Sequence, residues 1–176
     1  MRFVLLAALM PALGCGLWNP FIPDTQTPAD RARDLMPKCS SETGEGEGVG
    51  PAAIEQVTPL TSVVPSGNDR AIHLRGAELH MRPIDATSPE GLQRRLECHE
   101  ALVTLGRAAP MVDDPYVLDG QWLRLKVRSD GDGFVVSVQT DVLEQAKIVL
   151  ARAERFGAGA GRGASAEGSA PASATP

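Results

Sequence analysis

The sequence predicts a small α+β domain, a β-α-β-β-α sandwich in which two helices cover one face of a three-stranded sheet. Two observations predict this fold class. The first is that segments with the alternating apolar pattern of strands and segments with the apolar spacing of helices follow one another along the chain. The second is that short stretches with glycine and proline separate these segments. In chain order these segments are residues 71–82, 89–105, 122–128, 134–138 and 140–156. We therefore expect one globular domain over residues 70–157.

The first strand, residues 71–82, changes the phase of its alternation in the middle. Ile72 and Leu74 share one parity, whereas the apolar residues after Gly76 share the other. A β-bulge at Gly76 would insert one extra residue and return all the apolar side chains to the core face. These side chains are Ile72, Leu74, Ala77, Leu79 and Met81.

The first helix has clear start and stop signals. Ser88 is a typical N-cap, Pro89 fits the first turn, and Gly106 is expected to end the helix. Its apolar stripe has the spacing of a helix that packs on a sheet. The stripe consists of Leu92, Leu96, His99, Leu102 and Val103.

The other two strands are expected to form a hairpin around the loop 129–133, and Thr140 or Asp141 caps a last helix that ends at Gly157. A right-handed crossover places the third strand between the first two, antiparallel to both. This split β-α-β arrangement resembles a truncated ferredoxin-like fold. The inward side chains of the hairpin are Leu123, Leu125, Val127, Phe134, Val136 and Val138.

The sequence on both sides of this unit is rich in glycine, proline and small polar residues. Residues 158–176 are expected to form a disordered tail. Residues 15–69 are expected to form a tether and linker, with a short helix over residues 29–36. Within the linker, the apolar segment 54–64 is interrupted by Pro59 and followed by Pro65, which is consistent with an edge strand or a strap over the core.

The N-terminus, residues 1–14, has the features of a signal peptide. Arg2 supplies a positive charge, an apolar segment follows, and the run Ala12-Leu13-Gly14-Cys15 resembles the lipobox of bacterial lipoproteins. The resemblance implies that Cys15 carries lipid, palmitate included, and anchors the chain in the cell envelope, facing the periplasm. Gly16 favours the outer over the inner membrane. The alternative is ordinary secretion with an incidental cysteine.

The two other cysteines, Cys39 and Cys98, are expected to form a disulfide. Once Cys15 is assigned to lipid, two cysteines remain, and in an oxidising compartment two cysteines can pair. In the chain-entropy model a loop of this length contributes about 4 kcal/mol to stability. That is a large fraction of the total stability of a small domain.

The segment from Ile54 to Phe156 is similar to an uncharacterised family of exported bacterial lipoproteins. The resemblance lies in three stretches: Thr-Pro-Leu ending at Leu60, Leu96-Glu97-Cys98-His99, and the run from Arg128-Ser129 to Gly133-Phe134-Val135-Val136. The resemblance implies export and a lipid anchor, and it implies no activity.

Composition and motifs argue against several functional classes. A net charge of −5 leaves no excess of lysine and arginine to neutralise phosphates, so we expect no nucleic-acid partner. The sequence contains no nucleophile-elbow, zinc-protease or Walker-type signature. We therefore expect a protein that is not an enzyme and needs no cofactor.

Cys98 and His99 form the pair with the most suggestive chemistry. Adjacent helix residues point about 100° apart, so the pair alone is a poor metal site. We therefore favour a hydrogen-bonded core histidine beside a structural cysteine. The alternative function is a periplasmic copper-type protein in which His80 and Met81 complete the ligands with Cys98 and His99.

The outward face of the sheet is expected to be basic on an otherwise acidic protein. Its cationic side chains are Arg75, Arg82, Arg124, Lys126 and Arg128. One interpretation is a solvated face whose charges discourage edge pairing. The other is a docking face, and it supports our leading hypothesis: a non-catalytic lipoprotein, anchored in the membrane by its lipid, whose domain binds an envelope protein or an anionic polymer.

Overall fold

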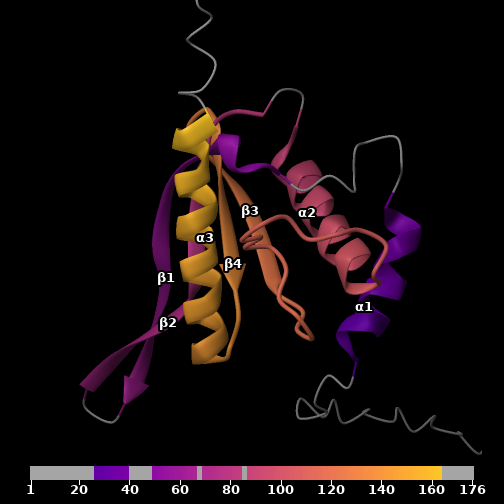
Figure 1. Cartoon of the computed structure of the whole chain (residues 1–176). Coiled ribbons are helices and arrows are strands. Elements are labelled where there is room, and N and C mark those ends of the chain that lie inside the picture. The colour runs from indigo at the N-terminus through magenta and orange to yellow at the C-terminus, as the bar shows by residue number, and fades with distance from the viewer. Residues whose placement is uncertain (1–25, 40–48, 67–68, 85–86, 164–176) are drawn as a thin grey trace, which may run out of the picture.

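The protein is an α+β domain with a four-stranded antiparallel sheet and three α-helices among the residues that the computed structural model describes, which are 26–39, 49–66, 69–84 and 87–163 (Figure 1). Two short 3₁₀ helices, Met36–Lys38 and Pro51–Ala53, accompany them. The main elements are α1 (Pro28–Leu35), β1 (Ile54–Ser66), β2 (Asp69–Met81), α2 (Pro89–Thr104), β3 (Arg124–Asp130), β4 (Gly133–Gln139) and α3 (Leu143–Gly163).

The strands lie in the order β1-β2-β4-β3. β4 pairs antiparallel with both β2 and β3, which confirms the predicted split β-α-β arrangement. The expected count of three strands is wrong, because β1 adds a fourth strand by pairing with β2 from Ile54 to Ser66. The segment expected as an edge strand or a strap is the edge strand, a place where Pro59 and Pro65 are tolerated because the free edge needs no N–H donor.

The predicted bulge at Gly76 is present. Leu60 pairs with Gly76 and the next residue, Thr61, pairs with Leu74, so Arg75 is the extra residue on β2. Gly76 has a φ of 143°, and a side chain there would place its Cβ atom 1.9 Å from the carbonyl oxygen of Val138. The bulge thus needs glycine both for its backbone conformation and for close contact with β4.

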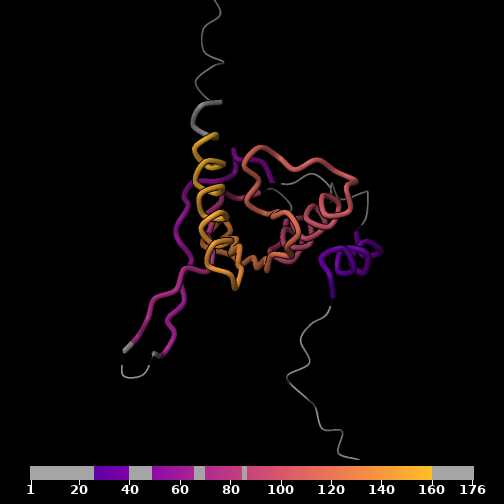
Figure 2. The backbone as a smooth tube through the Cα atoms, turned by 60° about the horizontal axis from the view of Figure 1, so that its bottom comes forward, coloured from indigo at the N-terminus to yellow at the C-terminus, as the bar shows by residue number. Residues whose placement is uncertain are grey.

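β1 and β2 leave the sheet beyond this bulge as a two-stranded projection. We call it the hairpin arm: residues 61–66 of β1 and 69–74 of β2 (Figures 1 and 2). β4 ends at Gln139, opposite Gly76, so no third strand among the described residues accompanies the arm. The expected inward position of Ile72 is therefore wrong, since its side chain is 74% exposed on the arm.

One hydrophobic core joins the sheet to α2 and α3, which cover the same face of the sheet. α3 packs on β2 and β1, and α2 packs on β3. Tyr116, from the loop between α2 and β3, fills the space between the helices and meets the ring of Phe156 edge-on, with centroids 6.0 Å apart. The fully buried side chains of this core include Leu79, Leu92, Leu96, Leu123, Val136, Val138 and Val149.

The start of α2 is as predicted, whereas α3 begins at Leu143 rather than directly after Thr140 or Asp141, and it ends later than predicted. The Ser88 hydroxyl accepts a hydrogen bond from the Gly91 amide at 3.1 Å, as expected of an N-cap. α3 runs through Gly157, the predicted stop, and continues to Gly163. Residues 158–163 of the predicted tail are therefore helical, and residues 164–176 lie outside the described residues.

A disulfide joins Cys39 to Cys98, with the two Cα atoms 5.8 Å apart, as predicted from the even number of remaining cysteines. It ties the end of the 3₁₀ turn after α1 to the middle of α2, against which α1 packs. α1 and β1 both fall within residues 15–69, the stretch expected to hold the tether and linker. The expected signal peptide and the lipid-bearing Cys15 lie outside the described residues.

Candidate functional site

His99 is a hydrogen-bonded core histidine, as predicted from the sequence. Its side chain is 3% exposed, and its Nε2 atom lies 2.6 Å from Oδ2 of Asp114. Asp114 also accepts hydrogen bonds from the amides of Tyr116 at 3.0 Å and Met111 at 3.3 Å. Asp114 was not predicted as a partner from the sequence, although an aspartate just before a proline is a typical signal for a side chain that bonds its own loop.

The structure does not bring the four candidate copper ligands together. The sulfur of Cys98 is part of the disulfide, and Met81 is buried on the core face of β2. His80 alternates with Met81 and faces the other side of the sheet, where its Nδ1 atom lies 3.6 Å from Asp130. In the described part of the chain, no group of three or more His, Cys, Asp or Glu side chains could hold a metal ion.

Glu100 is a buried carboxylate next to this cysteine and histidine. Its Oε1 atom accepts a hydrogen bond of 2.6 Å from the amide of Leu123, whereas Oε2 is buried without a partner among the described residues. Burial raises the pKa of Glu100 well above its ordinary value, against the opposing effect of the Leu123 amide. Glu100 thus fixes the backbone just before β3, where the candidate site begins.

The face of the sheet away from α2 and α3 is the first part of the candidate site. We call it the open face, and it carries Glu78, His80, Lys126, Arg128, Val135 and Ser137. Val135 is fully buried there although α2 and α3 lie on the other face, and it pairs in register with His80 on β2 and Arg128 on β3. The Ser137 hydroxyl donates to Glu78 at 3.1 Å and Asp130 lies beside His80, so the face combines cations with two carboxylates.

The five predicted cations do not have equal surroundings. Arg75 and Arg124 both pair with Asp141, Arg124 at 3.4 Å, so one carboxylate partly neutralises two guanidinium groups. Arg82 donates to the carbonyl of Ala52 at the other end of the sheet. Lys126 and Arg128 are exposed on β3 and have no ion-pair partner in the described part of the chain.

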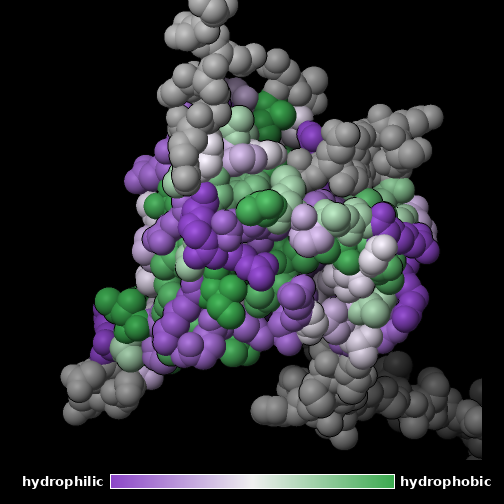
Figure 3. Space-filling view, in the orientation of Figure 1, coloured by the Kyte–Doolittle hydropathy of each residue, from purple (hydrophilic) through white to green (hydrophobic). Residues whose placement is uncertain are grey.

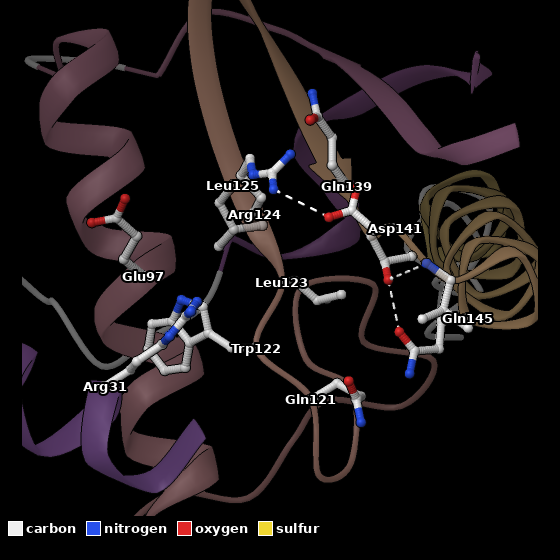
Figure 4. Close-up of a pocket in the computed structure, with 12 residues that line it drawn as sticks. Arg31, Glu97, Gln121, Trp122, Leu123, Arg124, Leu125, Gln139, Asp141 and Gln145 are labelled. Carbon is white, nitrogen blue, oxygen red and sulfur yellow. Dashed lines mark hydrogen bonds and ion pairs between the residues drawn. The ribbon is translucent and has the colours of Figure 1, made fainter. Parts of the chain in front are cut away.

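A groove at the end of the sheet is the second part of the candidate site (Figure 4). It lies between α1 and α2 on one side and the start of α3 on the other, and its volume is about 390 Å³. Arg124 belongs to both this groove and the strand that carries Lys126 and Arg128, so the two parts of the site meet there. Other side chains that line the groove are Arg31, Glu97, Gln121, Trp122, Gln139 and Gln145.

The groove offers donors and acceptors beside an aromatic ring. Two guanidinium groups, from Arg31 and Arg124, are balanced by the carboxylates of Glu97 and Asp141. Trp122 belongs to the segment 122–128 that was predicted to be a strand, but β3 begins at Arg124 and the half-buried indole lines the groove. Such a mixture suits the non-covalent recognition of a polar ligand.

Within the described ranges, no helix has both the length and the apolar character needed to cross a bilayer. Comparisons of the chain with protein-family models, with curated proteins and with solved structures found no match.

Proposed function

We propose that this chain is a lipid-anchored, non-catalytic protein of the bacterial cell envelope whose small domain binds another envelope component, a protein or an anionic polymer. The run ending at Cys15 supports the anchor. The disulfide between Cys39 and Cys98 supports an oxidising compartment, because such bonds persist outside the cytosol.

The observation that supports binding most directly is the pair of exposed cations on β3. Lys126 and Arg128 are two residues apart on a strand, so they point to the same side of the sheet. They lie on the open face and have no ion-pair partner among the described residues, in a chain whose net charge is −5. A local positive potential on an acidic protein attracts anionic partners.

The test reverses these two charges. Lys126→Glu with Arg128→Glu should lower retention of the full chain on purified lipopolysaccharide or peptidoglycan sacculi by at least about fivefold at low salt, where charges are least screened. The wild-type chain should lose the same retention at high salt. Folding should be unchanged, because both side chains are exposed.

A control variant makes the same change of charge elsewhere. Lys38→Glu with Arg107→Glu alters exposed cations in the turn after α1 and just beyond the end of α2. This variant should retain binding close to that of the wild type. Equal retention by the wild type and the β3 variant, or equal loss by both variants, would contradict binding through the open face.

A further inference from the structure

The hairpin arm carries large apolar side chains into solvent. Val63 is 60% exposed, Val64 is 41% exposed and Ile72 is 74% exposed. Figure 3 shows this apolar group at the lower left of the molecule, beside hydrophilic side chains of the main body. Val63 pairs directly with Ile72 across the two strands, so their side chains share one face of the arm. Val64, the next residue, points to the opposite face.

The start of α3 and the residue before it add further exposed apolar groups near the base of the arm. Val142 and Leu143 are each half exposed. Asp141, the residue before them, pairs with Arg75 at the bulge where the arm begins, and the Thr140 amide donates to the Arg75 carbonyl at 2.9 Å. Two segments that are distant in sequence thus place apolar side chains at the same end of the domain.

The chain also enters the domain at this end. The arm, the first turn of α3 and the start of α1 at Pro28 all lie at the bottom of Figure 1, and Figure 2 shows the arm and the start of α1 extending in the same general direction. Pro28 follows Cys15 by 13 residues, so the intervening chain reaches at most about 45 Å when fully extended. A lipid on Cys15 would therefore hold the start of α1 within about 45 Å of the bilayer, which lets this end of the domain reach the bilayer surface.

We propose that the hairpin arm contacts the lipid bilayer in which the chain is anchored, with Val63, Val64 and Ile72 inserted at the level of the headgroups and upper acyl chains. This inference rests on the proposed lipid anchor at Cys15. Transfer of apolar side chains from water to the membrane interface lowers the free energy of an anchored protein. Exposed Arg70 on the same arm is placed to meet anionic headgroups.

A bilayer fits the arm better than a second copy of the chain does. The apolar side chains point to both faces of the two-stranded arm, and lipid surrounds an inserted hairpin, whereas a docked protein covers one face. Of the two free edges of the arm, the one that belongs to β1 carries Pro65 near its end, and Pro59 lies near the base. Proline at these positions discourages pairing with a strand of another chain.

The test measures lipid contact by fluorescence. The lipidated full chain, in a Trp18→Phe and Trp122→Phe background, is reconstituted into vesicles of phosphatidylethanolamine and phosphatidylglycerol with brominated acyl chains. Ile72→Trp reports on the arm, and Val112→Trp is the matched control because Val112 is 87% exposed on the loop between α2 and β3. Tryptophan at position 72 should be quenched at least about threefold more strongly than at position 112.

The outcomes separate this inference from the proposed function. Flotation with the vesicles without preferential quenching at position 72 overturns the arm's lipid contact and leaves the anchor intact. A chain that fails to float, as the Cys15→Ser variant should, overturns both. Cross-links between the arms of two copies, again without preferential quenching, would assign the apolar side chains to a dimer and overturn the inference. Val63→Trp provides a second reporter on the same face of the arm.

Discussion

Glu100 positions the chain before β3 through a hydrogen bond, although burial of its carboxyl group costs stability. Its carboxylate is fully buried and accepts the Leu123 amide with one oxygen only. Burial disfavours the charged form, and the nearby carboxylates of Glu97 and Asp114 add to the effect, so the pKa lies well above its ordinary value. The bond to Leu123 nonetheless fixes the chain where it turns into the groove and then into β3.

This raised pKa predicts how Glu100→Gln changes with pH. An unfolded glutamate ionises above about pH 4.3, whereas the folded one stays protonated to higher pH, so rising pH favours the unfolded wild-type chain. The variant lacks this titration. Its free energy of unfolding should therefore rise relative to that of the wild type between about pH 4 and pH 7, as measured by urea denaturation. Exposed Glu154→Gln is the control, and parallel pH curves for Glu100→Gln and wild type would refute the prediction.

Single-residue features could be predicted where the signal was local. The placement of His99 in the core followed from the apolar stripe of its helix, and the Ser88 cap followed from its neighbours. The partner of His99 could not be predicted in the same way, because Asp114 lies 15 residues away on a loop of irregular structure. The same reason applies to Glu100, whose partner Leu123 is 23 residues distant.

At the scale of elements, tertiary packing overrides the helix-stop signal of Gly157. A Cβ atom at this position would lie 3.4 Å from the Cγ2 methyl groups of both Ile54 and Val57. The glycine therefore brings α3 close to β1, and it occurs within the helix for that reason. The sequence gives no sign of this contact, since β1 precedes α3 by the whole length of the domain.

Gly157→Ala and Gly157→Leu should have opposite effects. Alanine adds a methyl group at ordinary contact distance and removes the helix penalty of glycine, so it should raise the free energy of unfolding by about 0.5–1 kcal/mol. Leucine must displace the methyl groups of β1 and should lower it by about 1–3 kcal/mol. Gly159, in the same helix with open space around it, is the control at which both substitutions should be tolerated. A destabilising alanine or a neutral leucine at position 157 would contradict this explanation.

A strand was easier to predict where apolar and polar residues alternate clearly along it. β3 begins with clear alternation and β4 has apolar residues at Phe134, Val136 and Val138, and their antiparallel pairing beside β2 follows from the short loop and the crossover rule. β1 was left between two interpretations because Pro59 and Pro65 interrupt its pattern. The arm was missed because alternation indicates a strand without indicating how far the rest of the sheet extends beside it.

At the scale of the whole molecule, the disulfide holds α1 against the domain. It closes a loop of 59 residues that contains the outer strand and the arm. Cys39→Ser with Cys98→Ser should lower the free energy of unfolding by about 4 kcal/mol in the chain-entropy account, measured by guanidinium denaturation of the lipid-free chain. Proteolysis should also then reach α1 first. Cys15→Ser is the control and should leave the free energy of unfolding unchanged, whereas a loss below about 1 kcal/mol for the double variant would contradict this role.

The groove opens at the end of the domain that carries the arm, since its lining includes the start of β3 and the residues just before α3. With the arm inserted in the bilayer, the groove faces the thin aqueous layer between the domain and the headgroups. That layer acts as a size filter. Small polar molecules and lipid headgroups can diffuse into it, whereas bulky polymers are held back and can reach the domain only from its flank, at Lys126 and Arg128 on the open face.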